Sequence, residues 1–547
     1  MDDTPVSFLD EWGRLKASRS TLERHWQEVS ERFDPIQARF FEQQKQEGEK
    51  TTPQNYDSTG QAASEKFSAI LESVLTPGGK EAWHTLRPPG LDQEIDPTDP
   101  VAVWLDQANR TLYQTRNSPK SNFAGQQSLI YRGLGVLGTS CMFVDSAPEK
   151  GIFLRYRAIH MAGVCIGIDA FGRVDRVLYR YSLNARQAVQ EFSKRGDLLP
   201  KAIQDAAKNS PSQTYWFLHC VYPNPDVTFG KIGPSGMKFA SRHICEYDQS
   251  MVRRSGYRTM PYIIPRFFIG VGEDYGRSPA MYALGDQKML NHMAAFRFRA
   301  AQRELDPIWL TTDDAIMTPL RTRPGAINGG MLNDDGSPRV RPMLPTGQRF
   351  EIDAAITDET RRAVNDFFYI NLFQILVDTP NMTATEALIR AREKAALMAP
   401  PTTRMQSECL GPMLEREMDL LFNAGRFAPL PEEMLALGGQ YEIEYQSPYA
   451  SAAEADQATA VLQTINAVAP IVQFEPDILD NFRLDNMVRT VAKGFRIPVD
   501  NFATPDEVQA KRDQAAQQKA LAAMTAAAQP VAGAVKDLAQ SGVMGNA

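Results

Sequence analysis

The residues that could support catalysis or metal binding are two pairs of acids and two pairs of histidine and cysteine. Asp313-Asp314 and Asp334-Asp335 could bind Mg²⁺, but both lie in a Gly/Pro-rich segment with no convergent His or Lys. His219-Cys220 and His243-Ile244-Cys245 contain zinc-binding residue types, yet they lie in strand-like sequence, where neighbours point to opposite faces. We therefore interpret the acids as solvated turn residues and the histidines and cysteines as core or surface residues.

Two glycine-containing turns could cradle phosphates, but neither has the required spacing. Pro77-Gly78-Gly79-Lys80 lacks the preceding glycine of a nucleotide-binding loop, and Gly270-Val271-Gly272 is followed by EDYG instead of the dinucleotide-binding pattern. We interpret the second segment as a turn before a helix. No cofactor is expected.

Four basic residues between 288 and 303 form the pattern that most clearly suggests a binding surface. Lys288, His292, Arg299 and Arg303 are spaced so that a helix would confine them to a sector of about 60°. This basic stripe could contact the phosphates of a nucleic acid. It could instead be solvated, or paired with acidic groups of a neighbouring subunit, and the residue pattern leaves these interpretations open.

The apolar residues near the basic stripe indicate what packs beside it. Met289, Met293, Phe296 and Ala300 form an apolar stripe that could pack against a later helix, residues 357–377. That later helix is expected to be buried on several sides, because its end is apolar around nearly the whole circumference. The residues concerned are Phe367, Phe368, Tyr369, Ile370, Leu372, Phe373, Ile375, Leu376 and Val377.

The elements that carry these residues have recognisable ends. Ser278 is expected to cap a helix that runs unbroken to Leu305, where Asp306-Pro307 stops it. A Pro- and Gly-rich excursion, residues 306–350, then separates this helix from the next, which is expected to begin at Thr357. Two long helices therefore flank one compact excursion.

The N-terminal region also has helical periodicity. Residues 7–33 place apolar side chains at alternating steps of four and three, with Ser7 as the expected N-cap and Arg19 in one apolar slot. Such a seam packs within its own domain or forms an intermolecular coiled coil. We favour packing within the domain, because the repeat is interrupted and ends at Asp34-Pro35.

The rest of the first half combines helices with strands. Helical patterns cover residues 58–76 and about 100–136, and short β-rich runs follow from about 139 to 269, two of them joined by the turn at 169–172. The sequence therefore predicts an α+β fold that is predominantly helical.

Length and composition limit the class of protein. The 547 residues, 43% of them hydrophobic, allow a sizeable core, and five scattered cysteines indicate reduced, buried thiols. The 59 Lys and Arg against 66 Asp and Glu give a net charge of −7, which excludes a globally cationic binder of nucleic acid or membrane. Neither a secretion signal nor a long apolar run is present, so we expect no membrane insertion.

Several motifs, in their order along the chain, resemble those of portal proteins, the head-to-tail connectors, of short-tailed, podovirus-type bacteriophages. Tyr56-Asp57-Ser58-Thr59 precedes a helix that ends at Leu75-Thr76-Pro77, and Gly272–Pro279 (GEDYGRSP) heads a long helix. His219–Pro223 (HCVYP) and Thr383–Glu386 (TATE) are further matches. Together they span about residues 7–500, and the tail beyond 503 matches only in its Ala/Gln-rich composition.

The resemblance implies a portal-type subunit with wing, stem, clip and crown that assembles into a ring. Residues 1–276 would be the wing, 277–305 and 351–377 the stem helices, 306–350 the clip, 378–385 the tunnel loop, 386–450 helices that return through the wing, 451–502 the crown, and 503–547 a tail that forms a barrel or stays disordered.

The resemblance also implies a role for individual residues. Asn381, Met382 and Thr383 of the tunnel loop would lie nearest the DNA, and Lys288, His292, Arg299 and Arg303 would be weaker channel candidates. Phe367, Phe368, Phe373 and Leu376 would lie at the stem interface between subunits, and Arg321, Arg323, Arg339 and Arg341 on the docking surface of the clip.

The implied activity is passive and non-enzymatic. About twelve copies would form a ring at one capsid vertex, at the head-tail junction of the virion, after synthesis in the host cytoplasm. Double-stranded DNA would be packaged and ejected through the ring. The large terminase subunit and later a tail adaptor would dock on the clip, while the wing would face the major capsid and scaffolding proteins.

Two other classes of protein remain as alternatives. An enzyme of DNA metabolism would need the acidic pairs to bind Mg²⁺, whereas the sequence places them in loops. A scaffold or interaction protein would remain a monomer. Metal-dependent cleavage, ATP turnover and native mass distinguish these alternatives from a portal.

Overall fold

The computed structural model describes most of the chain, in segments. The described residues are 3–41, 55–78, 83–89, 99–147, 151–192, 197–228, 230–231, 233–311 without 306–308, 321, 327–329, 331–342, 350–371, 400–436, 438–445, 448–472, 482–495 and 507–520. The chain forms two compact units, residues 1–81 with 115–424 and residues 82–114 with 425–547. The predicted α+β, predominantly helical fold is confirmed.

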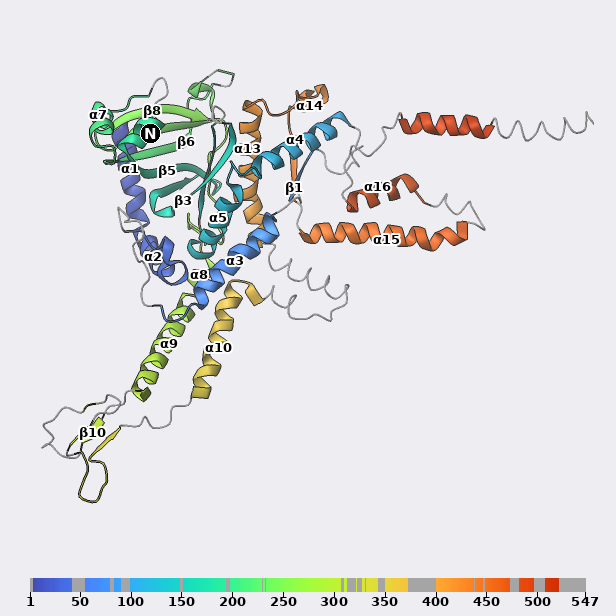
Figure 1. Ribbon diagram of the computed structural model, residues 1–547. Helices are drawn as coiled ribbons and strands as arrows, with labels where there is room; N and C mark the ends of the chain where they lie inside the picture. Colours follow the sequence, from blue (N-terminus) through green and yellow to red (C-terminus); the bar gives the residue numbers. More distant parts are fainter. Residues whose placement is uncertain are drawn as a thin grey trace, which may run out of the picture. The chain divides into compact units, whose positions relative to one another are not determined.

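A five-stranded antiparallel sheet is the largest sheet of the first unit (Figure 1). Its strands follow the chain in the order β4 to β8, as a meander. The predicted turn at 169–172 joins the first two, with Asp169 N–H donating to the Arg173 carbonyl at 2.8 Å. The strands are β4 (Val164–Ile168), β5 (Val174–Asn184), β6 (Thr214–Pro223), β7 (Phe239–Cys245) and β8 (Ser250–Tyr257).

Helices cover both faces of this sheet. Leu218 and Phe217 are neighbours in β6 and point to opposite faces. Leu218 packs with Phe8 of helix α1 (Pro5–Ser18), and Phe217 packs against α6 (Ala185–Glu191) and α7 (Lys201–Asn209). The N-terminal seam therefore packs within its own domain, as predicted.

The N-terminal segment is two helices instead of one. Helix α1 begins at Pro5 after Thr4, so Ser7 lies inside the helix and is not its N-cap. The chain breaks at Arg19 before α2 (Ser20–Phe33). The apolar periodicity continues across this break, which explains why the sequence predicts a single helix.

A second, three-stranded sheet is surrounded by helices. It has the order β3 (Ile152–Ile159), β2 (Cys141–Ala147), β9 (Tyr262–Ile263). Helices α5 (Phe123–Leu137) and α13 (Gly411–Asn423) contact β2 and β3, and α3 (Thr59–Leu75) packs on α5. A π-helical turn, Gln406–Leu410, precedes α13. Helix α3 has the bounds that the sequence predicts.

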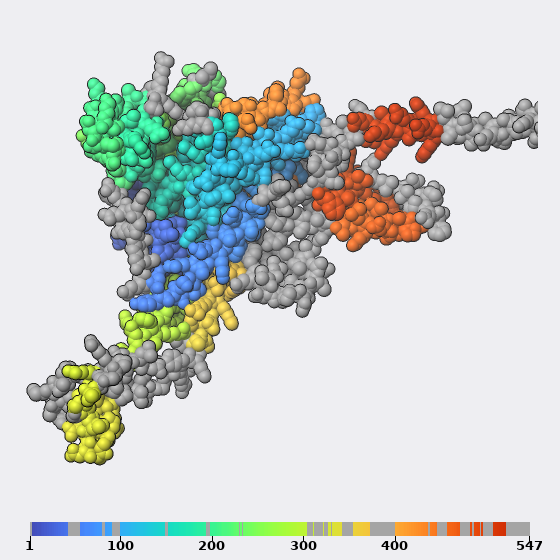
Figure 2. Space-filling view, in the orientation of Figure 1, coloured from blue at the N-terminus to red at the C-terminus, as the bar shows by residue number. Residues whose placement is uncertain are grey.

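The predicted stem helices differ from expectation: the first is broken and the second begins earlier. Ser278 accepts a hydrogen bond from Met281 N–H at 3.1 Å, so the predicted N-cap is confirmed. The helix is interrupted at Ala283, however, which separates α8 (Pro279–Tyr282) from α9 (Leu284–Leu305). The next helix, α10 (Phe350–Phe367), begins before Thr357, which lies inside it. Both α9 and α10 reach the molecular surface, in yellow-green and golden yellow in the space-filling view (Figure 2).

The described part of the predicted clip contains one antiparallel strand pair. Strand β10 (Trp309–Thr311) pairs with β11 (Val340–Pro342), with Leu310 opposite Arg341. A turn precedes β11, where Gly336 adopts the left-handed conformation at φ 82°.

The second unit combines a strand pair with helices. Strand β1 (His84–Arg87) pairs with β12 (Glu442–Tyr445), and the Trp104 indole of α4 (Pro100–Arg116) donates to the Ala428 carbonyl at 3.0 Å. It also contains α14 (Glu432–Ala436), α15 (Pro448–Val472) and α16 (Leu484–Gly494), and residues 507–520 are helical as well. The predicted boundaries of wing, crown and tail stay predictions.

Candidate functional site: the stem helices and their anchor points

Helices α9 and α10, the predicted stem helices, are held by one short segment of the chain. Arg361 of α10 binds the Asp57 carboxylate with a separation of 3.0 Å between Nη2 and Oδ2. Gln287 of α9 donates to the Asp57 carbonyl at 3.1 Å, and Asn291 accepts from Tyr56 N–H at 2.6 Å. Residues 56–60, which carry one of the family motifs, thus fix the position of both helices.

The charge of Asp57 is stabilised inside this anchor. Its side chain is only 4% exposed. Burial by itself would raise the pKa of Asp57, but the hydrogen bonds from Thr59 and the charge of Arg361 lower it below its usual value. The anchor therefore depends on an ionised Asp57.

Gly60 allows the close approach of α2 and α9 to the start of α3. A Cβ atom at this position would lie 2.8 Å from Phe33 Cε1 and 2.9 Å from Gln287 Oε1. The Gly60 amide also donates to Gln287 Oε1 at 3.0 Å. A larger residue would therefore displace both the aromatic core and the anchor of α9.

The segment before α8 is a second anchor point, where two stretches of backbone cross. Gly276 N–H donates to Thr139 Oγ1 at 2.8 Å, and a Cβ at Gly138 would lie 2.5 Å from the Arg277 carbonyl carbon. Gly138 also has a φ of 76°. Ser278 donates to the Val136 carbonyl at 2.8 Å, so this motif joins α8 to the end of α5.

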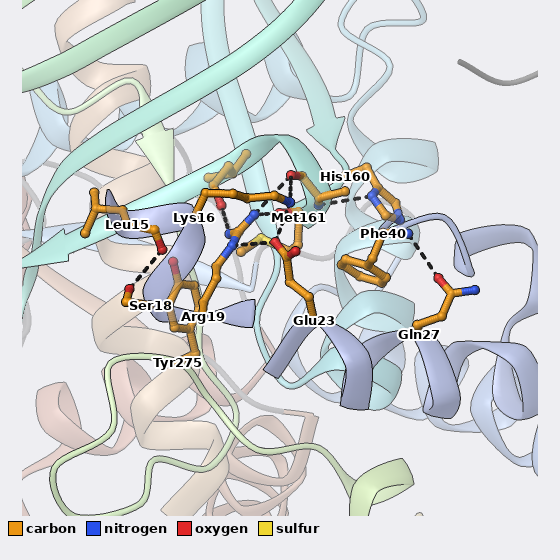
Figure 3. Close-up of polar contacts among 12 residues, drawn as sticks. Leu15, Lys16, Ser18, Arg19, Glu23, Gln27, Phe40, His160, Met161 and Tyr275 are labelled. Atoms are coloured by element: carbon orange, nitrogen blue, oxygen red, sulfur yellow. Dashed lines mark hydrogen bonds and ion pairs between the residues drawn. The ribbon is translucent and has the colours of Figure 1, made fainter. Parts of the chain in front are cut away.

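Arg19, which the sequence places in an apolar slot, is a buried polar centre (Figure 3). Its guanidinium donates to Glu23 at 2.8 Å and to the backbone carbonyls of residues 161, 162 and 164. It also lies 5.8 Å from the ring centroid of Tyr275, within the GEDYGRSP motif. These contacts connect the α1–α2 break to the loop that precedes α8.

Helix α13 is fixed by a buried ion pair that no sequence pattern indicates. Arg116 Nε lies 3.2 Å from both carboxylate oxygens of Glu417, and neither side chain is exposed. The Tyr156 hydroxyl donates to the same carboxylate at 2.5 Å. Arg116 and Glu417 are 301 residues apart, so spacing alone could not have paired them.

The histidines considered as metal ligands lie in the core, as predicted. His219 and His243 stack across β6 and β7 with ring centroids 3.9 Å apart. Burial holds the pKa of His219 well below its usual value and that of His243 at about 3, so both rings are neutral. His219 is bonded to the Tyr262 hydroxyl at 2.6 Å and to the Ser241 hydroxyl at 2.9 Å.

The described acids do not form a metal site either. Asp335 accepts from Ser337 N–H at 3.0 Å within an exposed turn, as predicted, while Asp313-Asp314 lies outside the described residues. Within the described segments, no cluster of three potential metal ligands occurs and no helix is suited to crossing a membrane. The five cysteine thiols are free and buried.

The basic stripe is partly paired and otherwise exposed. Lys288 binds Glu28 of α2 at 2.5 Å, which ties α9 to α2 within one subunit. His292, Arg299 and Arg303 are exposed. The apolar stripe does not pack on α10 as predicted, because Phe296 is 65% exposed. Helix α9 contacts α10 through a different face, where Arg297 donates to Thr357.

The residues expected at the subunit interface have different environments. Phe367 is 41% exposed, whereas Phe368 is fully buried in its own chain, with ring centroids 5.6 Å from Phe33 and 5.8 Å from Phe67. Phe368 is therefore part of the core of its own chain, with no surface exposed for a second subunit. Phe373 and Leu376 lie outside the described residues, as does the whole tunnel loop, Asn381, Met382 and Thr383.

The described arginines of the predicted clip lie at the surface. Arg321 is exposed, and its backbone exchanges two hydrogen bonds of 2.9 Å with the Asn328 side chain. Arg339 donates to Asn333 at 2.9 Å, and Arg341 is exposed on β11. Arg323 lies outside the described residues.

Comparison with known proteins identifies relatives along nearly the whole chain. A family model described as bacteriophage head to tail connecting protein matches residues 7–502. A probable portal protein of Bordetella phage BPP-1 is 27% identical over 527 residues, which covers 94% of this chain and 92% of the relative. The portal protein of Salmonella phage epsilon15 is 24% identical over 542 residues, covering 98% and 95%.

Solved structures of neck particles are more distantly similar. The neck of an empty GTA particle, computed with C6 symmetry, matches with a TM-score of 0.35 and 14% identity, over 74% of this chain and 85% of the other. The neck of the native GTA particle, computed with C12 symmetry, matches with a TM-score of 0.35 and 12% identity, over 74% and 86%.

Proposed function

Because the chain belongs to the family of bacteriophage head-to-tail connecting proteins, we propose that it is one subunit of a portal ring through which double-stranded DNA enters and leaves the head. The ring, of about twelve subunits, would occupy one capsid vertex. Portal proteins are structural components of the virion at the head-tail junction. The proposed activity is accordingly conduction and docking, without catalysis.

The observation that carries this proposal is the match over residues 7–502, supported by what the matching motifs do in the fold. Tyr56–Gly60 anchors α9 and α10, and Gly272–Pro279 joins α8 to the end of α5. Two helices held firmly at one end suit a channel wall, because a wall must keep its geometry while DNA moves past it.

DNA contacts in the proposed channel are weak and repeated. Asn381, Met382 and Thr383 of the tunnel loop are proposed to lie nearest the duplex. DNA carries one charge per roughly 1.7 Å, so a strongly basic lining would hold the duplex in place, and small neutral side chains permit movement. The net charge of −7 per subunit is consistent with a conduit.

The partners of the ring are proposed by region. The clip arginines Arg321, Arg323, Arg339 and Arg341 would form the surface on which the large terminase subunit docks during packaging and the tail adaptor afterwards. The wing would face the major capsid and scaffolding proteins. Arginine suits such docking surfaces because its planar guanidinium binds carboxylates in a bidentate manner.

Native mass spectrometry and negative-stain microscopy of the purified full-length protein test the proposal directly. We expect a closed ring with a central channel. A protein that remains a monomer or dimer under all conditions contradicts the portal function and supports a scaffold protein. Metal-dependent DNA cleavage or ATP turnover by the same preparation supports the enzyme alternative instead.

A further inference from the structure

Helix α9 has one face that is occupied within the subunit. Leu290 is 1% exposed, and Arg297 donates to Thr357 of α10. If Met289 is taken as the zero of rotation about the helix axis, these two residues lie at about +100° and +80°. The side of α9 at about +90° therefore faces α10 of the same chain.

The opposite side of α9 is a basic edge. His292 lies at about −60° and Arg299 at about −80° on the same scale, and both side chains are exposed. An apolar stripe separates this basic edge from the face that contacts α10. Its members Met289, Met293 and Phe296 lie between about −20° and +40°. The order around α9 is therefore contact face, apolar stripe, basic edge.

Helix α10 repeats this order. Taking Ile356 as zero, the buried residues Thr357 and Val364 lie at about +100° and +80°. Ile356 is 42% exposed and Phe367, at about +20°, is 41% exposed. With Ala363, at about −20°, they form an apolar stripe on α10 that is equivalent to the stripe on α9.

The edge of α10 that corresponds to the basic edge of α9 is acidic. Glu359 lies at about −60° and Asp366 at about −80°, and both are exposed. Asp366 accepts a hydrogen bond of 2.6 Å from Asn371 of its own chain. Arg362 lies further round, at about −120°. The two acids are seven residues apart, as are His292 and Arg299 on α9.

Helix directions decide where these two edges lie relative to one another. The helices are antiparallel, because Gln287 and Arg361 share the Asp57 anchor while Arg297 meets Thr357 further along. Two antiparallel helices in contact are related by a half-turn, so both apolar stripes lie on the same side of the pair. The basic edge and the acidic edge then form its two outer flanks, facing away from each other.

Such a pair of helices can repeat around a ring. If α9 and α10 alternate around the circumference, the basic flank of each subunit faces the acidic flank of its neighbour. The contact is heterologous, because one surface of a subunit meets a different surface of the next, and a rotation closes it into a ring. All the apolar stripes would lie on one side of the resulting layer of helices.

A ring also fixes the register of this contact. If α9 and α10 run along the ring axis, rotation about that axis leaves each residue at its own height, and the Arg297–Thr357 contact sets approximately which residues of neighbouring copies are level. Glu359 is then level with a point between His292 and Arg299, about 4.5 and 6 Å from them along the axis. Both separations are within reach of long side chains.

We propose that the basic edge of α9 docks on the acidic edge of α10 in the adjacent copy of this chain, with His292 and Arg299 facing Glu359. The inference rests on the proposed ring function and names its stem contact. It assigns the exposed part of the basic stripe to assembly instead of to the DNA channel.

Charge reversal tests the contact. Arg299→Glu alone and Glu359→Arg alone each place like charges opposite one another, and each should raise the midpoint concentration for ring formation by about tenfold or more. Combining both substitutions in one chain should restore assembly. Lys208→Glu, an exposed charge reversal on α7, is the matched control and should leave the midpoint unchanged.

Mixing the two single variants distinguishes a contact between subunits from one within a subunit. In a ring that alternates the two variants, every contact joins either two substituted side chains or two native ones, and both combinations pair opposite charges. A 1:1 mixture should therefore form rings containing equal numbers of both variants, as measured by native mass spectrometry with one variant mass-tagged. Arg299→Gln should raise the midpoint concentration for ring formation less than Arg299→Glu does. Circular dichroism checks that each variant is folded.

Several outcomes would overturn the inference. Single variants that assemble like the wild type exclude the charge contact, and a double variant that recovers while the mixture does not places the contact within one subunit. If a variant with both Arg299→Glu and Arg303→Glu forms normal rings that fail to package DNA, the basic stripe belongs to the DNA channel. Absence of rings in the wild type contradicts the portal function itself, which separates the two failures.

Discussion

Replacing Arg116 by methionine should destabilise the first compact unit by about 3–5 kcal/mol, because the charge of Glu417 would remain buried without its partner. Both side chains are fully buried, and Arg116 Nε lies 3.2 Å from each carboxylate oxygen. Water cannot replace the lost contact at a side chain that does not reach the surface. The loss of unfolding free energy is therefore the cost of leaving the Glu417 charge buried and unpaired. This cost is much larger than the net contribution of the ion pair to stability.

Removing both charges should recover much of this loss. Arg116→Met with Glu417→Leu leaves the Tyr156 hydroxyl without its acceptor, which costs about 1–3 kcal/mol. Adding Tyr156→Phe removes that donor as well, so the triple variant should lie within about 1 kcal/mol of the wild type. The three variants thus form a graded series.

The assay is urea-induced unfolding followed by far-UV circular dichroism, with hydrogen exchange of the α13 amides as a local readout. Arg155→Met is the matched control: its pair with Asp145 spans 3.6 Å with Arg155 49% exposed, so its loss should cost less than about 1 kcal/mol. A triple variant as unstable as Arg116→Met would refute the reasoning, because the cost could not then come from unpaired buried groups.

Three further perturbations follow from the anchors and the core. Gly60→Ala should cost about 1–3 kcal/mol in urea unfolding, whereas Gly13→Ala, where a Cβ meets nothing within 4 Å, should be neutral or stabilising. Burial lowers the pKa values of His219 and His243, that of His243 to about 3. Below about pH 6.5 both histidines therefore bind protons in the unfolded chain but not in the folded chain. The unfolding free energy should therefore fall as pH drops from about 6.5 towards 3, by up to about 1.4 kcal/mol per pH unit for each histidine, and a His243→Gln variant that kept the full slope would contradict this. The lowered pKa of Asp57 means that its stabilisation is present at neutral pH and is lost as pH falls through that pKa, so acid should increase hydrogen exchange in α10, and Asp57→Asn should show fast exchange already at pH 7.

Local signals predict the helix ends that depend on a few adjacent residues. Ser278 is recognisable as an N-cap because a serine before Pro279 satisfies the first turn of a helix by itself. Helix α3 ends at Leu75, with the expected Thr76 as its C-cap, for the same kind of reason: a Pro-Gly sequence follows it. In both cases the determinant lies within or next to the segment that it bounds.

Breaks that depend on distant partners are invisible in the local sequence. Arg19 interrupts the N-terminal helices because backbone carbonyls more than 140 residues away accept its hydrogen bonds. The acidic neighbours of Thr357 predict a helix start there, but α10 begins at Phe350, so those acids lie inside the helix. The Arg116–Glu417 pair belongs to the same class, since its members meet only in the folded chain.

The candidate site is predictable from the sequence as a pair of helices, but its contacts are not. The periodicity locates both the basic and the apolar stripe on α9. The prediction of which face contacts α10 is wrong, because Arg297 makes that contact and Phe296 is left exposed. The sequence identifies the Tyr56–Thr59 motif only by its resemblance to the family. The structure adds that Asp57 of this motif binds Arg361.

The crossing of backbone at Gly138 and Gly276 restricts how this protein can evolve. A Cβ at either glycine collides with main-chain atoms of the other strand of the crossing, Gly138 meeting Arg277 and Gly276 meeting the Gly138 carbonyl. No smaller side chain elsewhere can relieve a clash with backbone, so a substitution at one position has no compensating partner at the other. In a saturation library selected for function, both positions should retain glycine while neighbouring positions vary, and the two sites should show no covariation because neither can change.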